Sequence, residues 1–250
     1  MRLVAWNIRA GGGVRADSIA AQLQRWRIDV AALGEFRGTP PSLRIAEALV
    51  DGGLSHQSHT INPRAPAENR LLLASRWPIE RLTLSGAPSR SGKWIAARVF
   101  SPQPFIAIAV HVPNRVTGTK WPFHTATLRV ARAWANGPAL LCGDTNTGRI
   151  GIDEDVGASG FNAREDKWMC ALDNAGWSDA FRHPHGDRRE WTWHSPNAGT
   201  GYRIDQAFVN TAMIERLTAV KHAWGTDGRA ARRDAISDHA ALIVDFDWDV

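Results

Sequence analysis

The sequence of 250 residues is poor in cysteine and has no long apolar stretch. Its two cysteines, Cys142 and Cys170, cannot form a disulfide framework and lack the spacing of a zinc site, which indicates a reducing compartment. The longest apolar run, at 105–110, is too short to cross a bilayer. An expected strand at 2–8 leaves no room for a signal peptide. We therefore expect a cytoplasmic protein without a membrane partner.

Lysine and tyrosine are also scarce. Only four of the 30 basic residues are Lys, so the net charge of +5 comes almost wholly from Arg, and twelve Trp accompany a single Tyr. Large aromatic side chains dominate burial, so most of the Trp are expected in the core. An Arg guanidinium grips phosphate through two bonds, and a basic, Arg-rich chain therefore suits a polyanionic partner such as DNA. A GC-rich genome would explain why Arg is used in place of Lys. It explains the excess of basic over acidic residues less easily.

Two familiar enzyme motifs are missing. Residues Gly11, Gly12 and Gly13 are not followed by Gly-Lys-Ser/Thr, which excludes a P-loop. No Ser or Cys lies in a recognisable setting for a nucleophile. Any catalysis must therefore come from acids, amides and imidazoles.

An apolar run at 139–142, followed by Gly143, predicts a strand that is covered on both faces. Asp144 and Asn146 then project to the same side, because strand side chains alternate. A carboxylate and an amide at the carboxyl end of a buried strand stand where α/β proteins usually bind ligands. The alternative is a turn in which both side chains bond to their own backbone.

The same layout recurs along the chain. Other apolar runs adjoin groups that can bind a metal or move a proton, namely Asn7, Glu35, His111 and, before the run at 240–246, Asp238 and His239. In the expected strand at 203–209, Asp205 lies on a face that looks buried. A buried carboxylate needs a partner, and His239 is the natural candidate because carboxylates orient catalytic imidazoles in many hydrolases.

Oxygen donors outnumber imidazoles in this set of residues. Hard oxygen ligands favour Mg²⁺ or Mn²⁺ over Zn²⁺. A divalent ion, a histidine and an Arg-rich surface together indicate hydrolysis of a phosphate ester.

The order of the expected elements indicates an α/β protein. The first half alternates strand and helix, with Asp17 or Ser18 as the cap of the first helix, and the middle is antiparallel sheet joined by short turns. We expect one domain over 1–250, built from two packed mixed β-sheets with helices outside. Expected strands are 2–8, 29–34, 71–75, 79–84, 93–100, 105–111, 139–144, 191–194, 203–209, 217–222 and 240–246; expected helices begin near 17 and 40 and cover 121–134 and 164–175.

Six short motifs occur in order along nearly the whole chain: Trp6-Asn7-Ile8, Leu33-Gly34-Glu35, His111-Val112-Pro113-Asn114, Gly143-Asp144-Thr145-Asn146, Tyr202-Arg203-Ile204-Asp205 and Ser237-Asp238-His239. Gly-Asp-x-Asn together with a terminal Ser-Asp-His is a specific signal. With these motifs the chain resembles the endonuclease/exonuclease/phosphatase superfamily, which includes exonuclease III, the abasic-site endonucleases and deoxyribonuclease I. The resemblance implies a four-layered α/β-sandwich of the deoxyribonuclease I type.

The resemblance also implies roles by position. Glu35 would hold the metal, with Asn7 and Asp238 nearby. Asp144 would orient or deprotonate the attacking water. Asn146 would hold Asp144 or the phosphate.

His239, paired with Asp205, would meet the phosphoryl oxygens or act as the base. Whether Asp144 or His239 is the base stays open at this point. Asn114 would contact phosphate. Arg115, in the adjacent loop, is a candidate for binding the DNA backbone, with a solvated loop as an equal alternative.

Two positions depart from the pattern of the abasic-site enzymes. Those enzymes usually carry Tyr where this chain has His111, whereas deoxyribonuclease I has His there, and His111 would then protonate the leaving oxygen. Arg9 stands where some relatives have another acid or Asn, so metal binding would rest more on Glu35. Both departures bear on which substrate is bound. They do not change the expected class of reaction.

The sequence thus predicts a Mg²⁺- or Mn²⁺-dependent phosphodiesterase that acts on DNA, at abasic sites or 3′ ends. We expect a monomer that binds backbone phosphates with little sequence preference. One alternative is the same chemistry on a small phosphorylated molecule or a phospholipid head group. Another is a nucleic-acid-binding module without catalysis.

Overall fold

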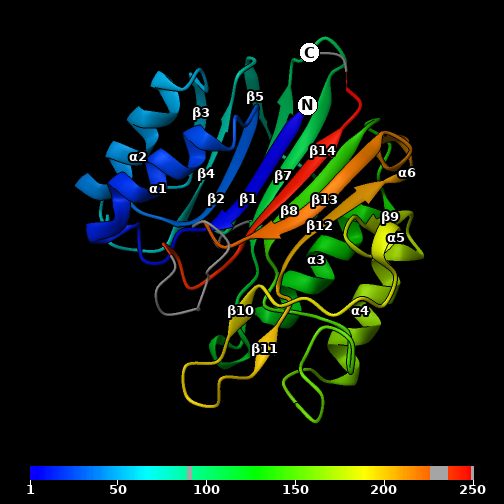
Figure 1. Cartoon of the computed structure of the whole chain (residues 1–250). Coiled ribbons are helices and arrows are strands. Elements are labelled where there is room, and N and C mark those ends of the chain that lie inside the picture. The colour runs from blue at the N-terminus through cyan, green and yellow to red at the C-terminus, as the bar shows by residue number, and fades with distance from the viewer. Residues whose placement is uncertain (89–91, 226–235, 249–250) are drawn as a thin grey trace.

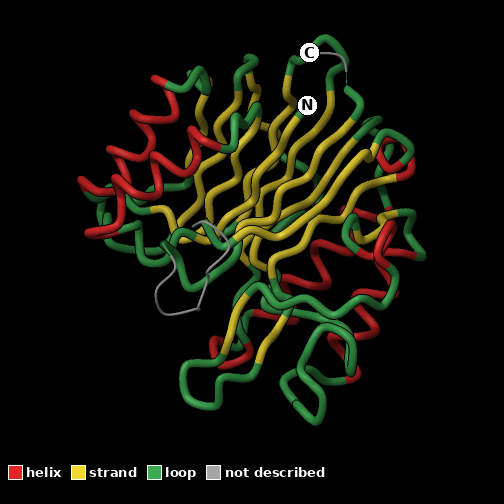
Figure 2. The backbone as a smooth tube through the Cα atoms, in the orientation of Figure 1, coloured by secondary structure: helices red, strands yellow, loops and turns green. Residues whose placement is uncertain are grey.

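The computed structural model describes residues 1–88, 92–225 and 236–248. Within these ranges two β-sheets pack face to face, and helices cover the outer face of each sheet (Figures 1 and 2). Both sheets contain parallel and antiparallel pairs. The predicted α/β-sandwich of four layers is therefore confirmed.

The first sheet joins the two ends of the chain. Among the described residues its order is β13-β14-β1-β2-β4-β3, in which only β1 and β2 are parallel. The segment that precedes β14 therefore lies beside the end of β1. The strands are β1 (Arg2–Asn7), β2 (Val30–Phe36), β3 (His56–His59), β4 (Arg70–Ser75), β13 (Leu217–Ala223) and β14 (Ala241–Phe246).

The second sheet has the order β5-β6-β7-β8-β12-β9 within the described ranges, and only β7 and β8 are parallel. A separate short hairpin, β10 (Trp193–His194) and β11 (Gly201–Tyr202), lies beyond its end (Figure 1). The strands of the sheet are β5 (Ile79–Leu82), β6 (Trp94–Val99), β7 (Phe105–His111), β8 (Ala139–Asp144), β9 (Trp177–Asp179) and β12 (Asp205–Asn210).

Helices α1 and α2 cover the first sheet, and α3 and α4 cover the second (Figure 1). In the part of the chain that is described, none of the helices is long and apolar enough to cross a membrane. The helices are α1 (Ala16–Arg25), α2 (Pro40–Asp51), α3 (Lys120–Arg132), α4 (Ala163–Asp173), α5 (Arg182–His185) and α6 (Thr211–Ile214), with 3-10 turns η1 (Gly13–Arg15) and η2 (Arg115–Thr117).

Apolar side chains form three layers between the four layers of secondary structure. The middle layer joins the two sheets and contains Leu73 and Ala107 as well as Cys142, which is a core residue as predicted. The two outer layers join each sheet to its helices, as Ile19 of α1 and Phe123 of α3 illustrate. Because both faces of the central strands are covered, strands such as β7 and β8 are apolar until their last residues.

Several expectations from the sequence are corrected. Helix α1 begins at Ala16, directly after η1, so neither Asp17 nor Ser18 caps it. Strand β2 continues past Gly34 to Phe36. The short strands β3, β9 and β11 were not predicted, because their few residues carry too weak an apolar pattern.

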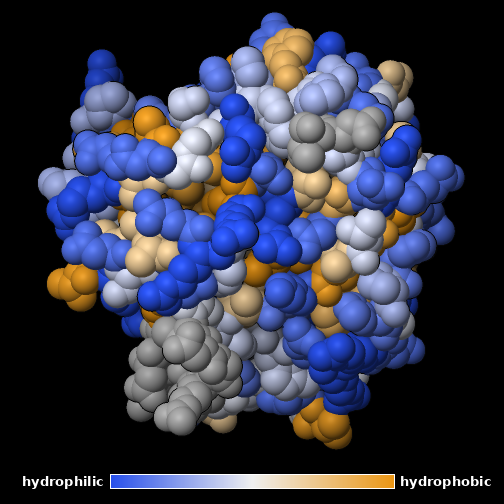
Figure 3. Space-filling model, turned by 45° about the horizontal axis from the view of Figure 1, so that its top comes forward, coloured by the Kyte–Doolittle hydropathy of each residue, from blue (hydrophilic) through white to orange (hydrophobic). Residues whose placement is uncertain are grey.

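Tryptophan is less buried than predicted. Five of the twelve Trp are buried, and the other seven are half-buried. Large apolar side chains such as Val14 and Val116 are fully exposed, and on the face shown in Figure 3 apolar residues form separate spots among hydrophilic ones. Scattered exposure of this kind is normal for a folded protein.

Gly143, in β8, is a position where the fold demands glycine. Its φ is 137°, and a Cβ at this position would lie 2.0 Å from the carbonyl oxygen of Val110 in β7. We expect Gly143→Ala to lower the free energy of unfolding by roughly 2–5 kcal/mol, because backbone strain and a backbone clash add together. Urea unfolding measures the loss.

Gly137→Ala is the matched control, because Gly137 also has a positive φ, of 77°, but has open space where its Cβ would be. It should cost only the conformational strain, about 1–2 kcal/mol. Equal losses in the two variants would show that the close approach of β7 and β8 does not require glycine.

Candidate active site

Polar side chains from both sheets meet at one end of the sandwich. Asn7 ends β1 and Glu35 lies near the end of β2 in the first sheet, while His111 and Asp144 end β7 and β8 in the second. Since β1 begins next to the N-terminus, this end lies opposite the N-terminus (Figure 1). The predicted convergence of separate motifs is therefore present in the fold.

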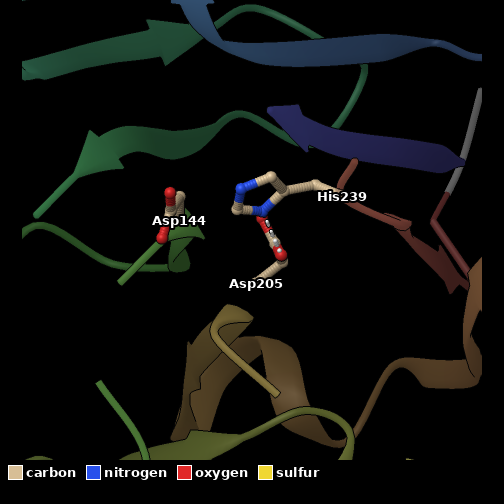
Figure 4. Close-up of side chains that lie close together, drawn as sticks. All are labelled: Asp144, Asp205 and His239. Carbon is tan, nitrogen blue, oxygen red and sulfur yellow. Dashed lines mark hydrogen bonds and ion pairs between the residues drawn. The ribbon is translucent and has the colours of Figure 1, made fainter. Parts of the chain in front are cut away.

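The tightest group consists of Asp144, Asp205 and His239. One ligand atom from each lies within 4.8 Å of the others, and all three residues are buried (Figure 4). The register of β8 and β12 places Asp144 directly opposite Asp205. His239 Nδ1 is 2.9 Å from Asp205 Oδ2, which is the pairing expected from the sequence. Figure 4 shows the imidazole between the two carboxylates.

The backbone around His239 is tied to the end of β1. Trp6 Nε1 donates to the carbonyl of His239 at 2.9 Å, and Ser237 Oγ donates to the carbonyl of Asn7 at 2.7 Å. The N–H of His239 in turn donates to Ser237 Oγ. These bonds fix the segment before β14, so the imidazole has a defined position relative to both sheets.

The surrounding carboxylates hold His239 in its charged form. Burial disfavours the imidazolium, but Asp205, its hydrogen bond, Asp144 and Asp238 outweigh this effect and raise the pKa of His239 from 6.5 to about 10. The ring is therefore a cation at neutral pH, with Nδ1 bound to Asp205 and Nε2 on its other side.

The side-chain nitrogen of Asn7 lies near three members of the site and donates to the two acids among them. Its Nδ2 lies 3.0 Å from Asp144 Oδ2, 3.5 Å from Glu35 Oε1 and 3.4 Å from His239 Nε2. Its Oδ1 accepts from the N–H of Arg9 at 3.0 Å. Asn7 stays a predicted metal ligand, and in the fold it presents its nitrogen to the acids. It therefore stands as a donor between the two sheets.

Glu35 sits in a β-bulge of β2, where the pairing with β4 shifts between Gly34 and Phe36. Its φ is 56°, and its Oε2 accepts from the N–H of Ala10 at 2.6 Å. A bulge redirects a side chain at a strand end, which explains how Glu35 reaches Asn7 although the strand continues.

Backbone strain gathers at this end of the molecule. Among the described residues, five that are not glycine have a positive φ. Four of these five belong to the segments that form the site: Arg9, Ala10, Glu35 and Asn146. Such conformations persist only where the surroundings hold them, and they are concentrated at functional sites.

The loop after β8 is both a local turn and part of the site, the two alternatives that the sequence offered for Asp144 and Asn146. Asp144 Oδ1 accepts from the N–H of Asn146 at 2.9 Å, as in a local turn, while Asp144 Oδ2 faces Asn7. Asn146 Nδ2 donates to the carbonyl of Val112, next to His111. A turn and a functional site are therefore compatible here, because the two oxygens of Asp144 have different partners.

His111 and Asp144 contrast with His239. Burial lowers the pKa of His111 to about 4, with Lys93 and His239 adding to the effect of burial and Asp144 opposing it. Its Nε2 is 3.7 Å from Asp144 Oδ2. Burial also raises the pKa of Asp144, although the two imidazoles counteract this. One imidazole is thus neutral and the other is charged, within one site.

The remaining predicted residues lie at the margin. Asp238 has a buried Oδ1 without a hydrogen-bond partner, and its Oδ2 is 3.7 Å from Arg9 Nε. Asn114 and Arg115 are exposed in the segment after β7 and lie outside the group of Asp144, Asp205 and His239. Arg115 donates to the carbonyl of Gly160. Arg115 therefore links two loops at the rim of the site.

The donor set is compatible with a divalent cation. Buried oxygens Oδ1 of Asp205 and Oδ1 of Asp238 have no hydrogen-bond donor, and burial disfavours the charge on Asp144. A hard cation satisfies carboxylate oxygens of this kind. Glu35 and Asp238, two of the three predicted ligands, lie outside the group of Asp144, Asp205 and His239.

Sequence reasoning missed two residues that support the site. Burial lowers the pKa of Lys93, just before β6, while the charges of Asp144 and Glu35 oppose this. Thr192 Oγ1 accepts from the N–H of Ile204 and of Asp205, and so fixes the start of β12. Neither residue belongs to a recognisable motif, so only their spatial neighbours reveal them.

Known proteins resemble the chain over nearly its whole length. Residues 4–239 match the sequence profile of the endonuclease/exonuclease/phosphatase family. Exodeoxyribonucleases from two strains of Streptococcus pneumoniae are each 24% identical to the chain, over 99% of its length and 100% of theirs. The predicted class of enzyme, a phosphoric-ester hydrolase, is thereby confirmed.

Solved structures show the same fold. The 3′-5′ exonuclease NExo from Neisseria meningitidis and the 3′ phosphatase NExo from Neisseria, bound to a product DNA hairpin, each have a TM-score of 0.78 and 24% identity to this chain. An AP endonuclease from Archaeoglobus fulgidus has a TM-score of 0.78 and 18% identity. All three comparisons cover 99% of this chain and 100% of the other.

The two imidazoles of the site should titrate far apart. In metal-free protein we expect His239 to lose its proton near pH 10 and His111 near pH 4, for the reasons of charge and burial given above. NMR of the ring protons, assigned with His239→Gln and His111→Gln, measures both midpoints. Two midpoints near 6.5 would contradict the described burial and pairing.

The same pairing predicts how stability depends on pH. The folded-state pKa of His239 lies above its ordinary value of 6.5. The pair of His239 and Asp205 therefore stabilises the fold fully below about pH 6.5, and this stabilisation is lost as the pH rises through 10. The free energy of unfolding should therefore fall over this interval. In the control variant Asp205→Asn, the fall should be smaller.

Proposed function

The chain belongs to the endonuclease/exonuclease/phosphatase family, and from this we propose that it is a divalent-metal-dependent phosphodiesterase that hydrolyses DNA at abasic sites or 3′ ends. The observation that carries the proposal is the buried group of Asp144, Asp205 and His239, with Asn7 and Glu35 beside it. This group offers a base, a cation and oxygen ligands at the end of two sheets, which is what hydrolysis of a phosphodiester requires.

Asp144 is the proposed base. Burial raises its pKa, and a carboxylate whose pKa lies closer to neutrality accepts a proton from water more readily. The N–H of Asn146 and the Nδ2 of Asn7 orient the two carboxylate oxygens. Asp144 can therefore hold the attacking water in one place and take its proton.

His239 is the proposed donor to a phosphoryl oxygen. Its raised pKa keeps the ring protonated at neutral pH, so it cannot also serve as the base. Asp205 holds Nδ1, which leaves Nε2 for the substrate. A preorganised cation of this kind stabilises the negative charge that grows as water attacks the phosphorus.

His111 is not well suited to be the acid that protonates the leaving oxygen. Its lowered pKa makes it neutral near pH 7, and a neutral imidazole gives up a proton much less readily than an imidazolium. We assign His111 a supporting role beside Asp144, because its Nε2 lies 3.7 Å from Asp144 Oδ2.

Glu35 and Asp238 are the residues that would hold the divalent cation. When bound, such an ion neutralises charge on a phosphoryl oxygen and lowers the pKa of a bound water. Arg9 lies 3.7 Å from Asp238 and is more than half exposed, so its side chain can move away from that acid. Asn7 keeps its nitrogen toward the acids and serves to align them.

The DNA substrate is supported by charge and by the named relatives. The chain has a net charge of +5 that derives mainly from Arg. Similar proteins are named exodeoxyribonuclease, 3′-5′ exonuclease, AP endonuclease and a 3′ phosphatase that was bound to a DNA hairpin. Binding would rest on backbone phosphates at the rim, where Asn114 and Arg115 are exposed.

Removal of the His239 ring should abolish most of the activity. We expect His239→Ala to lower kcat by roughly 10²–10⁴-fold, the range for losing one acid–base or charge-stabilising group. Steady-state cleavage of a fluorescent DNA measures the loss, and circular dichroism confirms folding. His183→Ala, at an exposed position in α5, is the control and should keep normal turnover. A near-normal rate in His239→Ala would remove His239 from the mechanism.

One panel of substrates tests the proposed function as a whole. It contains a duplex with an abasic site, nicked plasmid, single strands and a phosphomonoester, each with Mg²⁺, Mn²⁺ or EDTA. We expect cleavage of the abasic duplex or of 3′ ends with either metal and none in EDTA.

Salt separates the substrate classes. Binding through several backbone phosphates weakens steeply with salt, so KM for DNA should rise with ionic strength. Turnover of the phosphomonoester alone, with little effect of salt, would indicate a small-molecule phosphatase. DNA binding without cleavage under any divalent ion would indicate a non-catalytic module.

A further inference from the structure

Lys120, the first residue of α3, is a cation that is almost completely buried. Its side chain is 2% exposed, and that of Glu165 in α4 is 1% exposed. Lys120 Nζ donates both to Glu165 Oε1 and to the backbone carbonyl of Asn146. Burial lowers the pKa of Lys120, while Glu165 opposes this. Buried ion pairs are often no more stabilising than apolar residues of the same volume, so stability alone does not account for this lysine.

Glu165 has a fixed position because it belongs to a capping box. Its Oε2 accepts from the N–H of Asn162 at 2.9 Å, and the side chain of Asn162 accepts from the N–H of Glu165. The box holds the first turn of α4. Lys120 is therefore clamped between the start of α4 and the loop after β8.

The carbonyl that Lys120 contacts belongs to the residue that orients Asp144. The N–H of Asn146 donates to Asp144 Oδ1 and its Nδ2 donates to the carbonyl of Val112, both at 2.9 Å. Asn146 has a φ of 47°, a conformation that an ordinary residue keeps only when its neighbours hold it. The bonds at its N–H and at its carbonyl lie on either side of its Cα, so together they fix this conformation.

A second side chain holds the rest of the same loop. Gln206 Nε2 donates to the carbonyl of Thr147 at 3.0 Å, and Gln206 Oε1 accepts from Thr145 Oγ1 at 3.0 Å. These are neutral hydrogen bonds. The bond from Lys120 is assisted by charge, which makes such bonds roughly twice as strong as neutral ones. Lys120 thus adds the stronger restraint at the central residue, Asn146.

We propose that Lys120 is a positioning residue, which acts through the carbonyl of Asn146 to hold Asp144 in the orientation that catalysis needs. The inference rests on the proposed function, because it takes Asp144 as the group that activates water. Lys120 itself is buried and contacts the loop at the carbonyl of Asn146, so it acts through the loop and not on the substrate. Its loss should therefore lower kcat and leave KM unchanged.

Three variants separate positioning from stability. Lys120→Met leaves Glu165 as a buried anion whose remaining cationic partner is the half-exposed Arg115, with Nε 3.9 Å from Glu165 Oε1, so it should lower both Tm and kcat. Lys120→Met/Glu165→Gln removes that anion and keeps an acceptor for the capping box, so Tm should recover. Its kcat should stay low by roughly 10²-fold, the effect of a small misplacement of a catalytic group.

Glu165→Gln is the matched variant that keeps the lysine. Lys120 still donates to Asn146, so this variant should retain most of its turnover even though a buried cation has lost its partner and Tm falls. A double variant that regains kcat together with Tm would overturn the proposal, because Lys120 would then matter only for stability.

A second measurement decides the proposal without any assay of activity. Hydrogen exchange at the amide of Asn146, followed by NMR in metal-free protein, should be faster in Lys120→Met/Glu165→Gln than in Glu165→Gln. Equal exchange would refute the positioning role. If the unaltered protein cleaves none of the substrates, the proposed function fails, but the exchange rates still show whether Lys120 holds this loop.

Discussion

The pairing of β8 with β12 is the constraint on which the site depends. Its register places Asp144 opposite Asp205, and both carboxylates are buried. Two neighbouring anions in a low dielectric repel each other and have lost their hydration, so the surrounding protein must compensate them. His239 does so for Asp205, while Asn7 and the backbone of Asn146 do so for Asp144. The geometry of the site is therefore a consequence of how these charges are satisfied.

Compensation of this kind requires both sheets. The first sheet supplies Asn7 and Glu35, and the second supplies Asp144 and Asp205, so neither sheet contains the site alone. The apolar layer between the sheets holds them at a constant distance, and the strained backbone at Glu35 directs its side chain to the shared end. The energy gained in the core thus supports conformations near the site that would not persist by themselves.

The environment divides the titratable groups into different roles. His239 is surrounded by acids and remains charged, whereas His111 is buried with a lysine nearby and remains neutral. Pairs of groups whose pKa values are driven apart are typical of sites that move protons. Lys93 and Lys120 extend the pattern, because both are partly or wholly buried and both interact with Asp144. The field of more than one positive charge therefore acts on that carboxylate.

Strands such as β7 and β8 could be predicted from the sequence because they are largely apolar runs. Asp144 and His239 could be predicted as site residues because they lie in specific motifs. Short polar strands and Lys120 could not, because they carry no periodic pattern or motif. The types of residue and their order were enough to define a phosphate-ester chemistry and an α/β-sandwich. The sequence also indicated the pair of Asp205 and His239. Which imidazole is charged and which is neutral became known only from the folded chain, because burial and neighbours distant in sequence set each pKa.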